Sequence, residues 1–169
     1  VWDVNQRSLD AYFEMENNGF SIVVNVQNAQ FPVTIDPIST TAGIQLESNQ
    51  ANSNFGYPVS SAGDVNGDGY SDVIVGAFAY DNGQFDEGAA FIYQGSANGI
   101  STTAAIMLES NQLEARFGIS VASAGDVNGD GYSYVLVGAA YYDNGESDEG
   151  AVFIYHGSAA GINAIANTQ

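Results

Sequence analysis

Short runs of apolar residues, separated by clusters of Gly, Asn and Asp, cover most of the chain. The run Asp72–Ala77 is nearly all β-branched or small after its first residue, which predicts a strand buried on both faces. No run approaches the roughly 20 apolar residues that a membrane-spanning helix needs. The pattern therefore predicts an all-β fold and no membrane insertion.

A repeated unit organises the chain from residue 38 onward. Residues 38–99 align with residues 100–161 without a gap, and 44 of the 62 aligned positions are identical. Four short strands per unit, with turn signals between them, are typical of a β-propeller blade. A β-sandwich with a duplicated half is the alternative. In the first copy the strands are predicted at 45–47, 57–63, 72–77 and 88–93.

Residues 1–37 lie outside the repeat. Apolar residues alternate with polar ones on both sides of Asn17-Asn18-Gly19, which predicts a β-hairpin followed by an extended piece at 31–37. The chain begins at Val1 without an initiator Met, so we expect a processed protein or a piece of a longer one. The expected segments are 1–37, the repeats 38–99 and 100–162, and a tail at 163–169.

An Asp-rich loop in each repeat carries the candidate chemistry. In the first repeat, oxygen-bearing side chains stand at loop positions 1, 3, 5 and 9, and a backbone carbonyl is expected at position 7. Alternation turns every second side chain inward around a cation, and this hard oxygen set suits Ca²⁺. A turn without an ion is the alternative. The predicted ligands are Asp64, Asn66, Asp68, Tyr70 and Asp72.

The second loop repeats this pattern with one exception. Its predicted ligands are Asp126, Asn128, Asp130 and Tyr132, but position 9 is Tyr134, which has no carboxylate. We therefore expect the second calcium site to be weaker than the first.

An EF-hand is excluded by the residues that follow the two loops. It would place a bidentate Glu at position 12, where this chain has Val75 and Val137. A β-rich run follows each loop, whereas an EF-hand loop is followed by a helix.

The charge balance narrows the functional classes. The chain has 20 acidic residues against 2 basic ones and a formal net charge of −18. Such a surface repels phosphate backbones, which excludes nucleic-acid binding through a basic patch, and it favours cations. Because calcium is scarce in the cytosol, loops of this kind predict an extracellular or cell-surface location.

With these motifs in view, the chain resembles the FG-GAP repeats of integrin α-subunits and related bacterial surface proteins. The matching elements are Phe55-Gly56, Phe117-Gly118 and the two acidic loops, and the resemblance covers residues 38–162. It implies that each loop binds calcium within a blade of a β-propeller. The Gly-Ala-Pro triplet for which the family is named lacks its Pro here, because Phe78 and Ala140 stand at that position in the two repeats.

Two blades are too few to close a ring. A strand-like segment, Ile44–Ser48, lies near the start of the chain's first repeat, and the chain stops before a third copy of that segment. If this strand belongs to the neighbouring blade, each chain offers one strand and lacks one. The sequence then predicts a structural or adhesive homo-oligomer or filament that joins head to tail. The alternatives are a fragment of a larger propeller that binds a cell-surface protein or glycan, and an open unit capped by the N-terminal hairpin.

No catalytic constellation emerges, so the chain is not expected to be an enzyme. His156 is the only histidine, and it is expected at the surface. The pairs Asp86-Glu87 and Asp148-Glu149 recur with the repeat at expected loop tips, where solvated acidic turns are the simpler interpretation.

Overall fold

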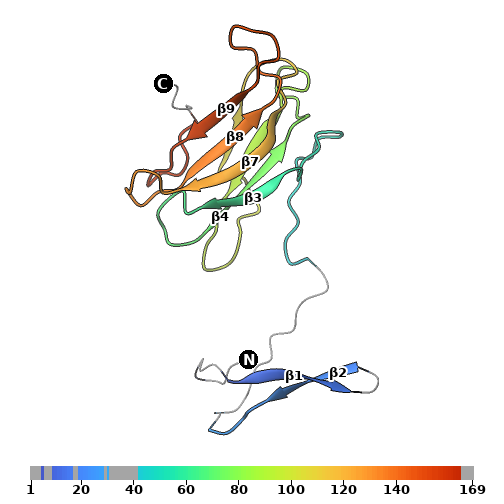
Figure 1. Ribbon diagram of the computed structural model, residues 1–169, viewed down its shortest axis with the longest axis vertical. Helices are drawn as coiled ribbons and strands as arrows, with labels where there is room; N and C mark the ends of the chain where they lie inside the picture. Colours follow the sequence, from blue (N-terminus) through green and yellow to red (C-terminus); the bar gives the residue numbers. More distant parts are fainter. Residues whose placement is uncertain (1–4, 6–8, 17–18, 29, 31–41, 165–169) are drawn as a thin grey trace. The chain divides into compact units, whose positions relative to one another are not determined.

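The computed structural model describes residues 5, 9–16, 19–28, 30 and 42–164 (Figure 1). The chain divides into two compact units, Val1–Gly43 and Ile44–Gln169. Within the described residues there is no helix of the length and apolar character that could span a membrane. Every regular element in that part of the chain is a β-strand.

The first unit contains the predicted hairpin. Strand β1 (Ala11–Glu16) pairs with β2 (Gly19–Val24) in antiparallel register, from Ala11 opposite Val24 to Glu16 opposite Gly19. The alternating pattern is thus confirmed as a hairpin. The tip at residues 17–18, the extended piece expected at 31–37 and the end of the expected tail, 165–169, lie outside the described residues.

The second unit begins with a four-stranded antiparallel sheet in the order β3-β4-β5-β6. Its strands are β3 (Val59–Gly63), β4 (Asp72–Ala77), β5 (Ala89–Tyr93) and β6 (Ile106–Glu109). The first three come from the first repeat, whereas β6 comes from the second.

The prediction of a strand at 45–47 is wrong, because those residues form no strand in this structure. Their counterparts in the second repeat lie in β6, which pairs with β5 of the first repeat. A strand has to find an edge with free backbone groups, and only the copy in β6 has one beside it in this structure. The unit of sequence repetition is therefore shifted by one strand from the unit of sheet pairing.

The second sheet has three antiparallel strands in the order β7-β8-β9. Strand β7 spans Phe117–Gly125, β8 spans Tyr134–Ala139 and β9 spans Ala151–Tyr155. Figure 1 shows β9 at the outer edge of this sheet. Among the described residues no strand pairs with the outer edge of β9, which corresponds to the edge of β5 that β6 covers.

The core of the second unit lies between the two sheets. Fully buried side chains of the first sheet, such as Ile74, Ile92 and Leu108, form one cluster with Phe117 and Val137 of the second sheet. A second cluster occupies the other face of the first sheet, where Val75, Phe91 and Tyr93 pack against Leu46 and Phe55. Strand β4 is thus buried on both faces, as its sequence predicts. The all-β, blade-like architecture is confirmed.

Candidate metal centre

The first acidic loop connects β3 to β4 and folds around the carboxylate of Asp64. Its Oδ1 atom accepts hydrogen bonds from the backbone N–H groups of Gly67 at 2.7 Å and Asp68 at 3.1 Å. Its Oδ2 atom accepts a third from Gly69 at 2.8 Å. Gly67 and Gly69 have φ angles of 73° and 89°, a region that glycine enters without a Cβ penalty. The loop therefore closes around the side chain at its first position.

Asn66 and Asp68 form the outer part of the same loop. The Asn66 Nδ2 group donates to Asp68 Oδ2 at 2.9 Å, and Asn66 Oδ1 accepts from the Asp68 backbone N–H at 3.2 Å. Asp68 Oδ1 accepts from the backbone N–H of Tyr70 at 2.9 Å. Asp68 is exposed and Asn66 is half-buried, so these two side chains have room to reorient toward a ligand.

Asp72, at loop position 9, is the buried carboxylate of the site, with 1% of its surface exposed. Its Oδ2 atom accepts from the Val65 backbone N–H at 2.8 Å, and its Oδ1 atom accepts from Gly95 at 2.9 Å. Burial raises the pKa of Asp72, the two backbone bonds oppose this, and the charges of Asp68 and Asp64 raise it further. These carboxylates therefore repel one another, and a bound cation would relieve that repulsion.

The second loop connects β7 to β8 and repeats the hydrogen bonds of the first loop at positions 1 to 7. Asp126 Oδ1 accepts from the backbone N–H groups of Gly129 at 2.8 Å and Asp130 at 3.1 Å, and Oδ2 accepts from Gly131 at 2.9 Å. Asn128 Nδ2 donates to Asp130 Oδ2 at 2.8 Å. Identical loop sequences thus give identical local structure, independent of which sheet carries them.

The two loops differ at position 9, where Tyr134 stands in place of a carboxylate. Its hydroxyl is hydrogen-bonded to Nε2 of His156, and the two rings meet edge to face with centroids 4.0 Å apart. His156 Nε2 also lies 3.3 Å from Asn128 Nδ2. The hydrogen bond from Asn128 lowers the pKa of Asp130, and His156 acts in the same direction. His156 is half-buried beside the second loop, so it is only partly exposed where the sequence predicts a surface residue.

The two loops are direct neighbours, which the sequence did not reveal. The backbone N–H of Ser133 donates to the Asp64 carbonyl at 2.8 Å, and the Asp64 N–H donates to Ser133 Oγ at 3.2 Å. The ring of Tyr132 lies against Gly67, where an added Cβ would sit 2.6 Å from the ring carbon Cε1. Each candidate site is therefore braced by the other repeat.

The donor set of the first loop fits calcium in its chemistry. Among the described residues, no three His, Cys, Asp or Glu side chains already converge as metal ligands do. Asp64 and Asp72 are held inside the loop, whereas Asn66 and Asp68 bond to each other and would have to turn inward. Three carboxylates, an amide and a backbone carbonyl are hard oxygen donors of the kind that Ca²⁺ accepts in irregular geometry. The residues that would hold the ion are Asp64, Asn66, Asp68, Tyr70 and Asp72.

Glu87 corrects the expectation of a solvated acidic turn. The side chain is fully buried, with 0% of its surface exposed, and its Oε1 atom accepts from the backbone of Asn82 at 2.6 Å and Gln84 at 3.3 Å. Its Oε2 atom has no hydrogen-bond partner. Glu149, the same residue of the second repeat, is exposed as expected. The two copies differ because the second repeat packs on the first, while no described segment covers Glu149.

Known proteins share the repeat region. Residues 64–137 match the family model described as FG-GAP-like repeat. Human integrin alpha-6 is 41% identical over 116 residues, which are 66% of this chain and 9% of that protein. Integrin alpha-PS2 of Drosophila melanogaster is 38% identical over 114 residues, 63% of this chain and 8% of that protein. Human integrin alpha-7 is 34% identical over 120 residues, 70% of this chain and 10% of that protein.

The matched region is a small part of these relatives. The chain spans 8%, 9% and 10% of the lengths of alpha-PS2, human alpha-6 and human alpha-7. The similarity to these integrins therefore concerns the repeat region and not their whole length.

Proposed function

Because the repeats of this chain belong to the FG-GAP family that integrin α chains share, we propose that the protein is a calcium-binding extracellular repeat protein with a structural and adhesive role. The observation that carries calcium binding is the loop closed around Asp64, with the buried carboxylate of Asp72 behind it. The second loop closes around Asp126 with the same hydrogen bonds and would form a second site, without a carboxylate at position 9.

Bound calcium would reduce the electrostatic repulsion between carboxylates in this molecule. The chain carries a formal net charge of −18, and five of its 20 acidic residues lie in the two loops at 64–72 and 126–134. A divalent ion in each loop would offset the repulsion among the loop carboxylates and stabilise the folded state by an amount that grows with the logarithm of the free calcium concentration once this exceeds the dissociation constant. We propose an extracellular location because free calcium is abundant there and scarce in the cytosol.

Calcium titration of the whole chain by isothermal calorimetry tests this proposal. Asp64→Asn should weaken the tighter binding event at least tenfold, because it removes a charge from the first position of the loop. Asp10→Asn, which removes the same charge from an exposed residue outside the repeats, should leave both events unchanged. Equal calcium binding by the two variants would contradict the assignment of the first loop.

We further propose that chains associate head to tail by strand donation. Within the described part of the chain, the outer edge of β9 has no partner strand, while residues 44–48 form no strand although they match the residues of β6 in sequence. Exposed strand edges pair readily with an added strand. Residues 44–48 of one copy would then lie on β9 of the next, which gives a ring if the rotation closes and a filament if it does not.

Solution mass by light scattering, in millimolar calcium and again in excess chelator, tests the association. Deletion of residues 38–48 should abolish assembly and leave calcium binding to the second loop. Gln45→Pro should act similarly with less disturbance, since Pro cannot donate to a strand ladder, whereas Gln45→Ala should assemble normally. Retained assembly by both the deletion and Gln45→Pro would contradict strand donation.

A second candidate function follows from the coverage of the relatives. Because the chain spans only about a tenth of the matched integrins, it can be one part of a longer propeller that binds a cell-surface protein or glycan. A single monomeric mass in calcium at all concentrations would favour this reading over self-assembly.

Catalysis is no part of the proposal. The single histidine, His156, is bonded to the Tyr134 hydroxyl, and the repeated acidic pairs divide into one buried and one exposed glutamate.

A further inference from the structure

We propose that the open end of the second repeat is a socket for the Phe-Gly pair of a second copy of this chain. Phe55-Gly56 of one copy would seat against Gly138 and Gly150 of the other. The inference rests on the proposed head-to-tail assembly and adds to it the contact that determines which surfaces meet.

The junction inside the chain supplies the template. The backbone N–H of Phe117 donates to the Glu87 carbonyl at 2.8 Å, and Phe117 forms a parallel bridge with Gly88. Gly118 lies so close to Gly76 that a Cβ there would overlap the Gly118 carbonyl oxygen. A Cβ on Gly118 would likewise overlap the carbonyl oxygen of Ala89. The Phe-Gly pair of the second repeat is therefore fitted into a backbone-lined recess of the first.

The second repeat has the corresponding recess, and its lining comes from the second repeat alone, with Ser120 Oγ lying against the buried Gly138. It forms a groove of about 450 Å³. Equivalent positions in the two repeats are 62 residues apart. Gly138 therefore corresponds to Gly76, and Gly150 corresponds to Gly88. The three atoms nearest to a Cβ added at Gly138, and likewise at Gly150, all belong to the second repeat. The groove is lined by Ile119, Ser120, Gly138, Ala139, Ala140, Glu149, Gly150, Ala151 and Val152.

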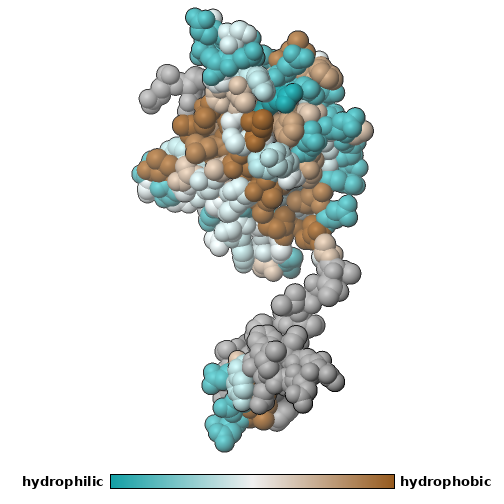
Figure 2. Space-filling model, turned by 45° about the vertical axis from the view of Figure 1, so that its right-hand side comes forward, coloured by the Kyte–Doolittle hydropathy of each residue, from teal (hydrophilic) through white to brown (hydrophobic). Residues whose placement is uncertain are grey.

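An apolar strip continues the groove along β9. Val152 is 66% exposed and Ile154 is 43% exposed. Their counterparts in β5, Ala90 and Ile92, are 0% and 1% exposed because the second sheet packs on them. The apolar face that the second sheet covers on β5 is thus present again on β9, where no described segment covers it. Figure 2 shows one face of the molecule, on which apolar patches alternate with hydrophilic ones.

The donor pair has the geometry that the socket requires. Gly56 has a φ of 89° and Gly118 a φ of 84°. The ring of Phe55 meets Phe91 edge to face with centroids 5.5 Å apart, and Phe117 meets Phe153 in the same way at 5.2 Å. The two Phe-Gly pairs therefore differ in surroundings rather than in conformation. Nothing lies within 4 Å of a Cβ added at Gly56, whereas Gly118 is packed on the first repeat.

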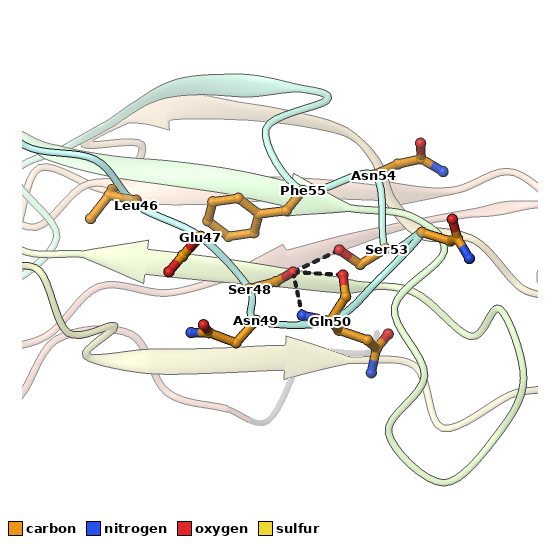
Figure 3. A pocket seen from close by; sticks show the side chains of 9 residues that line it. Leu46, Glu47, Ser48, Asn49, Gln50, Ser53, Asn54 and Phe55 are labelled. Atoms are coloured by element: carbon orange, nitrogen blue, oxygen red, sulfur yellow. Dashed lines mark hydrogen bonds between the residues drawn. The ribbon is translucent and has the colours of Figure 1, made fainter. Parts of the chain in front are cut away.

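The segment leading to the donor pair is also ordered by its own contacts. Figure 3 shows the polypeptide from Leu46 to Phe55 as a turn closed by the Ser48 hydroxyl, which lies 2.7 Å from Ser53 Oγ and accepts from the Gln50 backbone N–H at 3.3 Å. This preorganisation lowers the conformational entropy lost on binding. The turn would arrive at the socket already shaped.

The register of the donated strand follows from the internal pairing. In the first sheet Ile106 lies opposite Ile92, and Leu108 lies opposite Ala90. The same register between copies places Ile44 opposite Ile154 and Leu46 opposite Val152. Apart from Glu149 of the groove and Glu47 of the donated segment, the contacting surfaces consist of glycine, small and apolar residues.

Gly138→Ala tests the socket, because its methyl group would occupy the place of the Gly56 carbonyl of a second copy. Within one chain that methyl would conflict only with Ser120 Oγ, and Gly138 does not adopt a positive φ. The double variant Ser120→Ala/Gly138→Ala removes the conflict, and Ser120→Ala alone is the matched control. Thermal melts of both establish that they fold alike.

Sedimentation velocity of the whole chain across a concentration series in millimolar calcium is the readout. The midpoint concentration of assembly should match the wild type for Ser120→Ala and rise at least tenfold for the double variant. A second pair tests the apolar strip without touching the socket backbone. Val152→Arg should raise the midpoint at least tenfold, and Val152→Ala, which installs the residue found at position 90, should not.

The outcomes separate the two levels of inference. A wild-type chain that stays monomeric in calcium would overturn head-to-tail assembly and the second copy as occupant of the socket. Assembly of the wild type with an unchanged midpoint for the double variant would overturn the socket alone. A raised midpoint for the double variant and for Val152→Arg, with both controls unchanged, would support it.

Discussion

Gly118 of the second repeat lies against Gly76 of the first so closely that a Cβ at Gly76 would overlap the Gly118 carbonyl oxygen. Close backbone approach between two sheets is possible only where neither residue carries a side chain. This contact joins the two repeats into one body, together with the buried cluster around Phe117. Gly138 is the equivalent of Gly76 in the second repeat, but the atoms nearest to a Cβ added there belong to Ser120 of the same repeat. A side chain is therefore expected to cost more stability at position 76 than at position 138.

Gly76→Ala should lower the free energy of unfolding by about 1–3 kcal/mol, because the added methyl forces two backbones apart. The matched variant at the corresponding position, Ser120→Ala/Gly138→Ala, should differ from Ser120→Ala by less than about 0.5 kcal/mol under dilute conditions. Urea unfolding measures both. Equal losses at positions 76 and 138 would contradict the packing described for the internal junction.

The two calcium loops should have unequal affinities, because the first offers three carboxylates and the second offers two. Tyr134→Asp/His156→Gln gives the second loop the residues found at positions 72 and 94 of the first. Calorimetric titration should then show the weaker site tightened by tenfold or more. His156→Gln alone is the control and should not tighten it. Equal affinities in the wild type would contradict the assignment of Tyr134 as the weak point.

Alkaline pH should destabilise the fold through Tyr155. Burial raises the pKa of this phenol to about 12, from 10.0 for an unperturbed tyrosine. Because the folded-state pKa is the higher one, the contribution of Tyr155 to stability is complete below pH 10 and is lost as the pH rises toward 12. Tyr155→Phe should remove that part of the pH dependence, and Tyr57→Phe, at a residue that is 70% exposed, should retain it. Unfolding monitored by circular dichroism between pH 9 and 12 distinguishes the two.

Glu87→Gln should stabilise the protein at neutral pH by about 1 kcal/mol. A fully buried carboxylate whose Oε2 atom has no partner carries a desolvation cost that a neutral amide reduces, while Oε1 keeps its two backbone donors. Glu149→Gln is the matched control at the exposed counterpart and should change the stability by less than about 0.5 kcal/mol. A loss of stability in Glu87→Gln would show that the negative charge is itself needed.

Much of the local structure was determined by the sequence alone. The loops at 64–72 and 126–134 close around Asp64 and Asp126 with the same bonds, because the Asp, Asn and Gly spacing specifies those bonds within a few residues. Strand β4 spans the residues predicted for it, Asp72–Ala77. Alternation also sufficed to predict the hairpin of β1 and β2.

What only the tertiary structure decided is which copy of a repeated residue is buried. The matching segments 44–47 and 106–109 adopt different structures. Only 106–109 forms a strand, because only it lies beside the edge of β5. Glu87 and Glu149 likewise share a local sequence, and only Glu87 is covered by the neighbouring repeat. Hydrogen-bonded turns depend on near neighbours along the chain, whereas burial and sheet pairing depend on which segments meet in space. Near-identical repeats therefore specify near-identical loops, and their position in the stack decides the rest.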